Sequence, residues 1–451
     1  MSSGRTAIVV VHGMGNQTPL STIREFVEKF GKSDGILYSS PDRVTGDYEN
    51  RRFSYRNKEV DYFEYYWAHL MQEPTFYDVI VWSIKLFFFK RPSQRAKRLI
   101  YIMRVVLPTF ILILLGIGIY LNDSIIHFFD KTSTLIAGVA LFIIYKLTFP
   151  FIKTFFSNSI LQSIGDVVKY TVPSPQNIEV RNKIRAKGID MLKKLHEAKG
   201  DDGKLKYQNI VIIGHSLGSI VAYDMMTFLF HHCHNEVIYK EMPKQENTFD
   251  EAEDDCIEDP PIDEKKFPDD AKELTEEAKV ILGFSKKLYK NKCFDMEKFQ
   301  ETQHDIQIHY RRFEMPWRIP QFITLGSPLT HASMILAKDN EEFEKRKQIR
   351  EYPECPPVTD KNDLFKCFFE GNEKVWIPHH GAMFAMTKWT NIYFKNDYIG
   401  GDLHTEFGRG IKDIPIQAEK SCFRRLIPFA SHTSYWDKNE TNSIGHLREL
   451  M

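Results

Sequence analysis

The stretch NIVIIGHSLGS, residues 209–219, decides the fold of this chain. An apolar, β-branched run predicts a buried strand, and Gly214 and Gly218 bracket Ser216 in a Gly-x-Ser-x-Gly pattern. The apolar run from 220 to 226 predicts a helix directly behind the serine. A strand, a tight turn and a helix in this order predict a nucleophile elbow, in which the serine side chain projects from a strained corner.

Further strands and helices alternate on both sides of this stretch. Residues 6–11 predict a buried strand, and residues 20–31 predict an amphipathic helix. Alternating aromatic residues predict another strand over 60–67. A charged helix is expected over 177–199, and later strands are expected at 322–325 and 391–394. Strands that alternate with helices predict an α/β fold with a mostly parallel sheet flanked by helices.

Composition excludes some functional classes. The chain has 451 residues with 60 basic and 60 acidic side chains, so its net charge gives no reason to expect a nucleic-acid partner. Its six cysteines are scattered without a Cys-x-x-Cys pair, which predicts neither a disulfide framework nor a zinc ribbon and favours a reducing compartment. Residues 1–6 are polar and lead straight into a strand, so no signal peptide is expected.

Residues 78–156 are dominated by apolar side chains. Residues 105–121 carry no charge, and residues 134–152 carry only Lys146. Each stretch is just long enough to cross a bilayer, and basic residues flank the pair but are almost absent from the loop between them. The sequence therefore predicts an integral membrane hairpin of two spans, with the bilayer as a partner and the catalytic domain facing the cytoplasm.

Two other interpretations of the hairpin remain open. The two apolar stretches could form a buried or lid-type helix pair in a soluble enzyme, or could lie within one leaflet beside an interfacial helix at 79–91. The acidic segment 241–276 predicts a flexible insertion, with partner binding as the alternative. The expected organisation is a catalytic domain over 1–77 and 157–451, interrupted by the hairpin at 78–156 and the insertion at 241–276.

A nucleophilic serine needs a histidine base and a carboxylate that fixes the histidine tautomer. In α/β folds with a nucleophile elbow, the acid and then the histidine follow the serine in the chain. Asp397 directly follows a predicted strand, and His432 lies in a loop near the C-terminus, so Ser216, Asp397 and His432 are the predicted catalytic residues. The alternatives are Asp402 for the acid, and His404 and His446 for the base.

A developing oxyanion needs two backbone N–H donors. Leu217, directly after the serine, is the first candidate, and Met14 in the His-Gly-Met-Gly turn is the second, with Gly13 as its alternative. His12 is expected to be structural. The runs at 231–234 and 379–380 contain adjacent histidines, but their spacing does not predict a metal site. Ser327 is expected to end a strand.

Taken together, these motifs resemble the α/β-hydrolase superfamily in its lipase- and esterase-like branch. The resemblance covers about 1–70 and 160–451 and rests on the motifs around His12, Ser216, Ser327, Asp397 and His432. It implies a central, mostly parallel sheet, a Ser–His–Asp triad, and ester hydrolysis through an acyl-enzyme without a cofactor. The family does not fix the substrate.

The leading hypothesis is a membrane-anchored serine hydrolase that cleaves a lipid acyl ester. The alternatives are a soluble esterase or thioesterase with an apolar helical cap, and a catalytically inactive hydrolase fold that serves as a membrane scaffold. An acyltransferase using the same acyl-enzyme is a further possibility, because water and an alcohol compete for one intermediate.

Overall fold

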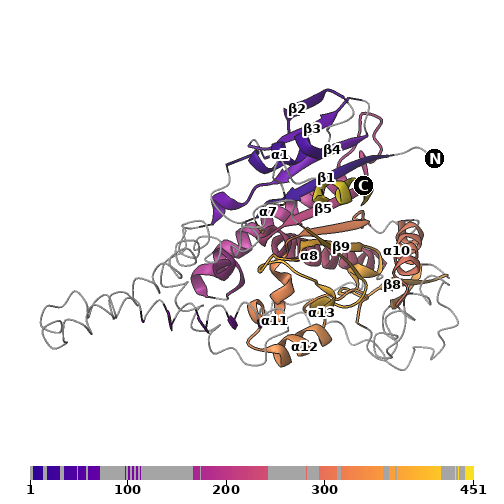
Figure 1. Ribbon diagram of the computed structural model, residues 1–451. Helices are drawn as coiled ribbons and strands as arrows, with labels where there is room; N and C mark the ends of the chain where they lie inside the picture. The colour runs from indigo at the N-terminus through magenta and orange to yellow at the C-terminus, as the bar shows by residue number, and fades with distance from the viewer. Residues whose placement is uncertain are drawn as a thin grey trace, which may run out of the picture.

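The computed structural model describes most of the chain outside the two predicted insertions (Figure 1). The described residues are 4–13, 18–30, 35–47, 49–56, 59–71, 166–172, 174–241, 294–311, 316–358, 365–370, 373–417 and 442–450, together with isolated positions between 97 and 112 and at 281, 432 and 435.

An eight-stranded sheet lies at the centre, in the spatial order β10-β9-β6-β5-β1-β4-β3-β2. The strands from β10 to β4 in this order run parallel, and β3 and β2 form an antiparallel edge. The strands are β1 (Arg5–Val11), β2 (Leu37–Pro41), β3 (Arg51–Tyr55), β4 (Val60–Tyr65), β5 (Tyr207–His215), β6 (Gln321–Leu325), β9 (Lys388–Phe394) and β10 (Ile411–Ile416). A separate antiparallel hairpin joins β7 (Phe365–Glu370) and β8 (Glu373–Pro378).

Helices connect the strands and cover both faces of the sheet (Figure 1). The α-helices are α1 (Ser21–Phe30), α7 (Pro175–Glu197), α8 (Leu217–Glu241), α10 (Met296–Arg311), α11 (Ala332–Ile335), α12 (Asn340–Gln348), α13 (His404–Phe407) and α14 (Asn442–Leu450). Short 3₁₀ helices are η1 (Ala68–Leu70), η4 (Pro328–His331) and η5 (Met383–Ala385).

The alternation of side chains along the strands divides the core in two. On β1, Val9 and Val11 pack in the cluster beneath α7, α8 and α10, whereas Ile8 and Val10 pack in the cluster beneath α1 and α14. β5 alternates in the same way, because successive strand side chains point to opposite faces. Burial on both faces explains why these strands are almost continuously apolar.

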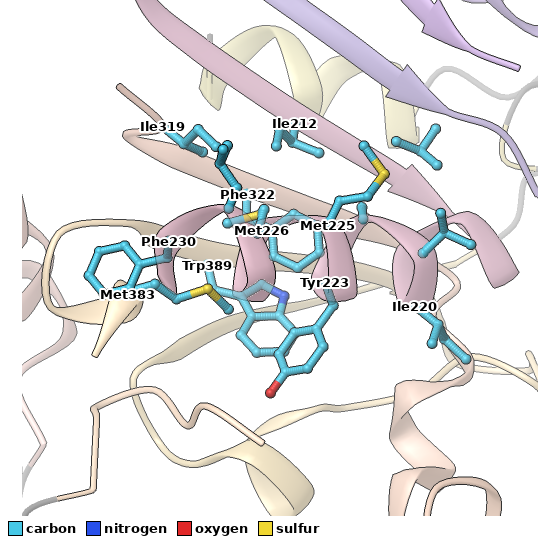
Figure 2. Close-up of a cluster of buried hydrophobic side chains, with 14 of the residues drawn as sticks. Ile212, Ile220, Tyr223, Met225, Met226, Phe230, Ile319, Phe322, Met383 and Trp389 are labelled. Carbon is cyan, nitrogen blue, oxygen red and sulfur yellow. The ribbon is translucent and has the colours of Figure 1, made fainter. Parts of the chain in front are cut away.

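The helix α8 lies across the centre of the larger cluster (Figure 2). Tyr223, Met226 and Phe230 from this helix meet Phe322 and Trp389 from β6 and β9. The Trp389 ring lies 5.6 Å from that of Tyr223 and 5.3 Å from that of Phe322, measured between centroids. This packing fixes α8, and with it Ser216 directly before the helix, against the parallel strands of the sheet.

The α/β class expected from the sequence is therefore confirmed. The elbow strand and its helix are present, and the other predicted strands appear as β1, β4, β6 and β9. The antiparallel edge of β2 and β3, the outer strand β10 and the β7–β8 hairpin were not predicted.

The predicted insertions lie almost wholly outside the described residues. Of 78–156, only scattered positions between 97 and 112 are described, and of 241–276, only Glu241 is described. Within the part of the chain that the structure describes, no helix is both long enough and apolar enough to cross a bilayer. The two-span hairpin and the flexible insertion stay predictions.

Candidate active site

Ser216 occupies the corner between β5 and α8. Its φ of +51° lies in the left-handed region, which is costly for a residue with a side chain and occurs where the surroundings enforce it. The backbone is held on both sides, because Ser216 N donates to Leu325 O at 2.9 Å and Ser219 N donates to Ser216 O at 2.9 Å. The local sequence thus forms the strained turn that the Gly-x-Ser-x-Gly pattern predicts.

The two glycines of the motif are required by close backbone approaches. A Cβ on Gly214 would lie 2.5 Å from Ser219 Cα. A Cβ on Gly218 would lie 2.2 Å from His12 O and 2.3 Å from Val11 O, where the start of α8 crosses the end of β1. Neither position has room for any side chain, so both glycines are fixed by packing.

The three predicted catalytic side chains meet in one hydrogen-bonded chain. Ser216 Oγ lies 2.7 Å from His432 Nε2, and His432 Nδ1 lies 2.9 Å from Asp397 Oδ2. All three residues are buried. An ionised aspartate only accepts hydrogen bonds, so His432 carries its proton on Nδ1 and presents the Nε2 lone pair to the serine hydroxyl.

Asp397 is kept ionised by several donors. Burial raises the pKa of Asp397. The charge and hydrogen bond of His432, together with the backbone N–H groups of Gly400 and Ile399, lower it by more. The pKa therefore lies below its ordinary value. Ile399 N donates to Oδ1 at 2.9 Å, and the Tyr435 hydroxyl donates to Oδ2 at 2.9 Å.

Tyr435 is a site residue that the sequence did not single out. Its hydroxyl donates to Asp397 and accepts from Phe394 N at 2.9 Å, so it ties the acid to the end of β9. A Cβ on Gly326, whose φ is +54°, would lie 2.4 Å from the Tyr435 ring, so the tyrosine packs directly over that glycine. The only signal in the sequence is the position of Tyr435 three residues after His432.

His215 is the second residue that sequence reasoning missed. Its ring stacks on that of His432, with 5.9 Å between centroids, and lies 5.5 Å from the Tyr435 ring. Burial, followed by the proximity of His432, lowers the pKa of His215 to about 3. The ring is therefore neutral at physiological pH and supports the base by packing without adding a charge.

Leu217, one of the two predicted oxyanion donors, directly follows Ser216. Leu217 is the first residue of α8, where backbone N–H groups have no partner within the helix and the helix dipole favours negative charge. Met14 lies outside the described residues. Its neighbour Gly13 is described and lies against the serine, since a Cβ there would be 3.0 Å from Ser216 Cβ.

His12, directly after β1, is held in place through both its ring and its backbone. Its Nδ1 donates to Gly13 O at 2.7 Å, and its Nε2 accepts from Trp67 N at 3.1 Å. The Trp67 ring stacks on the imidazole with 5.0 Å between centroids, and its Nε1 donates to His12 O at 3.1 Å. Burial lowers the pKa of His12 to about 4, so this is a neutral ring with both nitrogens engaged. These contacts give His12 a structural role.

The alternative acid and bases are engaged elsewhere. His404 Nδ1 pairs with Asp413 Oδ2 at 2.8 Å, and His446 Nδ1 lies 3.3 Å from Glu449 Oε2. Asp402 Oδ2 accepts from Thr405 Oγ1 at 3.3 Å.

Ser327 and the histidine runs have other surroundings. Ser327 Oγ lies 2.6 Å from Ser219 Oγ and accepts from Leu329 N at the start of η4, so this serine links two turns. The rings of His231 and His234 lie 5.7 Å and 6.2 Å from that of His380. Within the described residues, no group of three or more His, Cys, Asp or Glu side chains is arranged to hold a metal ion.

The arrangement of Ser216, His432 and Asp397 is suited to nucleophilic attack by a serine whose proton passes to a histidine. Comparisons of the chain with protein-family models, with curated proteins and with solved structures find no match.

Proposed function

We propose that the protein is a serine hydrolase of the α/β-hydrolase type that cleaves a carboxylic ester through an acyl-enzyme on Ser216. The observation that carries this proposal is the unbroken hydrogen-bonded chain from Ser216 Oγ through His432 to Asp397, starting at a serine with a positive φ. The residues follow β5, β9 and β10 in the order serine, acid, histidine, which is the order expected of this fold.

The reaction needs only groups of this chain and water. Ser216 Oγ attacks the ester carbonyl carbon while His432 Nε2 takes the hydroxyl proton, and the carbonyl oxygen becomes an oxyanion facing Leu217 N–H. Collapse of this intermediate expels the alcohol, which receives the proton from Nε2. Water then attacks the acyl-enzyme, gives a proton to Nε2, and the acid leaves as the proton returns to Ser216 Oγ.

A lipid acyl ester is the proposed substrate class, and the cytoplasmic face of a membrane is the proposed location. Both follow from the two apolar stretches at 105–121 and 134–152 and from the basic residues that flank them. An enzyme held at a bilayer meets its lipid substrate at high local concentration, which gives the apolar segment a function in catalysis.

Labelling with a fluorophosphonate probe tests the proposal. The wild-type protein is expected to react at Ser216, because His432 activates that hydroxyl, and Ser216→Ala is expected to lose labelling. Ser54→Ala, on β3 and outside the triad, serves as the matched control and is expected to label like wild type. Equal labelling of the wild type and Ser216→Ala would refute the assignment of the nucleophile.

The acyl-chain preference is tested with a series of ester substrates presented in micelles. Hydrolysis of long-chain esters in excess of acetate and butyrate esters is expected if the substrate is a lipid. A preference for the shortest esters would instead favour the alternative of a soluble esterase.

A further inference from the structure

A cavity of about 410 Å³ lies beside α8, and its lining includes none of the three triad residues. Its lining includes residues of α7, the part of α8 from Tyr223 to His231, the end of α12 and the segment that follows it. Neither this cavity nor another of about 670 Å³ next to Tyr65 and Tyr66 includes a triad residue in its lining. Its volume falls in the range of small-molecule sites.

Four arginines line this cavity: Arg181, Arg185, Arg346 and Arg350. Only two carboxylates, Asp224 and Glu351, line it with them. The arginines and carboxylates of the lining therefore leave two positive charges in excess. A concave surface with such an excess favours an anionic ligand.

Arg185 is held by Asp224 and by aromatic rings. Its Nε and Nη2 both donate to Asp224 Oδ2, at 2.9 Å and 2.5 Å, and the Tyr170 hydroxyl donates to the same oxygen at 2.8 Å. Its guanidinium lies 5.1 Å from the centroid of the Phe228 ring. Asp224 Oδ2 thus accepts hydrogen bonds from both Arg185 and Tyr170.

Arg346 is held in the same manner by Glu351. Its Nε donates to Glu351 Oε2 at 2.7 Å, its Nη1 donates to Leu336 O at 2.7 Å, and its guanidinium lies 4.8 Å from the centroid of the Tyr352 ring. Both carboxylates of the lining are consequently paired with arginines that the surrounding rings keep in place.

Arg181 has no carboxylate of its own. Its guanidinium donates to the carbonyl oxygens of Tyr170 and Thr171, both at 3.4 Å, and it forms no ion pair with the residues that the structure describes. Burial, and then the charge of Arg185, lower its pKa, which shows that its positive charge is poorly compensated. An anion in the cavity would supply the missing compensation.

Arg350 approaches the same cavity from the turn after α12. It has a φ of +68°, a conformation that is costly for arginine, and it is one of the residues that line the cavity. A planar guanidinium group can bind a phosphate through two parallel hydrogen bonds, and the rings of Tyr170, Tyr223 and Tyr352 add aromatic surface for the rest of a ligand.

We propose that this cavity is a binding site for a phosphate monoester, with Arg181 and Arg350 as its ligand-binding residues. The proposal is independent of catalysis at Ser216. The ester could be the headgroup of a membrane lipid or a soluble molecule. Tyr170 and Thr171 belong to residues 166–172, ten residues beyond the apolar segment 78–156, which favours a lipid headgroup.

The full-length protein in a neutral detergent is the material for the test. Isothermal titration calorimetry is carried out with glycerol 3-phosphate, with micelles that contain phosphatidic acid, and with micelles that contain uncharged diacylglycerol. Binding of phosphatidic acid but not of diacylglycerol is expected. Affinity that falls steeply with salt supports the charged site.

Arg181→Gln and Arg350→Gln are each expected to weaken binding about tenfold or more, because each loses a charged hydrogen bond. Arg56→Gln, an exposed arginine elsewhere, is the control, and Ser216→Ala is expected to bind as wild type does. Because Ser216→Ala separates binding from hydrolysis, a failure of either proposal leaves the other intact.

Two further outcomes of the calorimetry decide the identity of the ligand and the existence of the site. Equal binding of glycerol 3-phosphate and phosphatidic acid, weakened by both variants, supports the site with a soluble ester as its ligand. Absence of binding, or binding that both variants leave unchanged while their thermal unfolding stays as in wild type, overturns the proposal.

Discussion

At the scale of single residues, Ser216 combines a strained backbone with a complete proton path. A positive φ costs on the order of 1–3 kcal/mol for such a residue, and here the hydrogen bonds to Leu325 and Ser219 enforce it. The same conformation directs Oγ to His432 at 2.7 Å. The strained backbone conformation of Ser216 therefore also positions its hydroxyl for proton transfer to His432.

Tyr435 is expected to act as a positioning residue for Asp397. Tyr435→Phe removes one donor from Asp397 Oδ2 and the acceptor of Phe394 N–H. We expect kcat for an ester substrate to fall about tenfold with KM unchanged, because the loss of about one hydrogen bond affects the orientation of His432 and not ester binding.

Steady-state kinetics with an activated ester measure this split between kcat and KM. Tyr38→Phe, on the exposed strand β2, is the control. A Tyr435→Phe variant with wild-type kcat would show that the hydroxyl has a role in folding alone.

At the scale of elements, the start of α8 against the end of β1 is the tightest contact of the site. Gly218→Ala places a Cβ within 2.3 Å of two carbonyl oxygens, so either β1 or α8 must move. We expect a loss of more than about 4 kcal/mol in the free energy of unfolding, or failure to fold. Urea unfolding followed by circular dichroism measures this.

Gly445→Ala provides the matched comparison. Gly445 lies in α14, and nothing lies within 4 Å of the position of its Cβ. Alanine there is expected to stabilise the protein by about 0.5–1 kcal/mol, because glycine is the poorer helix former. Similar effects of the two substitutions would contradict the packing at Gly218.

Glu64 on β4 joins that strand to the start of α1. Its carboxylate accepts from Leu20 N at 2.7 Å, directly before the first residue of α1. Burial raises the pKa of Glu64 to about 7, against the opposing hydrogen bonds of Leu20, Ile23 and Thr22. The folded protein therefore binds a proton at Glu64 more tightly than the unfolded chain does.

Stability from this proton is fully present below the unfolded pKa and is lost as the pH rises through about 7. Relative to Glu64→Gln, which cannot titrate, the wild type is expected to lose unfolding free energy between about pH 5 and about pH 8. Urea titrations of both proteins at the two pH values measure the difference. A difference that stays constant or grows with pH would contradict the raised pKa.

At the scale of the whole molecule, the main prediction concerns the attachment of the α/β domain to a membrane. After carbonate extraction of membranes from expressing cells, we expect the protein to stay in the membrane fraction, because two apolar spans resist extraction. A variant that lacks residues 78–156 is the comparison and is expected to be released. Release of the full-length protein would favour the soluble esterase with an apolar cap.

Sequence alone determined the parts of the site that depend on local pattern. The β-branched run before Ser216, the two glycines and the helix behind them lie within a few residues of one another, so the local pattern predicts the strand, the turn and the helix without reference to distant segments. The chain order, the position of Asp397 directly after a predicted strand and the loop position of His432 favoured these two residues over Asp402, His404 and His446, and the structure brings them together with Ser216.

Only the tertiary structure decided the groups that support the triad. Tyr435 and Asp397 are 38 residues apart, and His12 and Trp67 are 55 residues apart, so their hydrogen bonds depend on how β1, β4 and β9 are ordered in the sheet. The arginine cavity likewise combines α7, α8 and the turn after α12. Contacts between distant segments follow from packing of the whole core, and no local periodicity in the sequence encodes them.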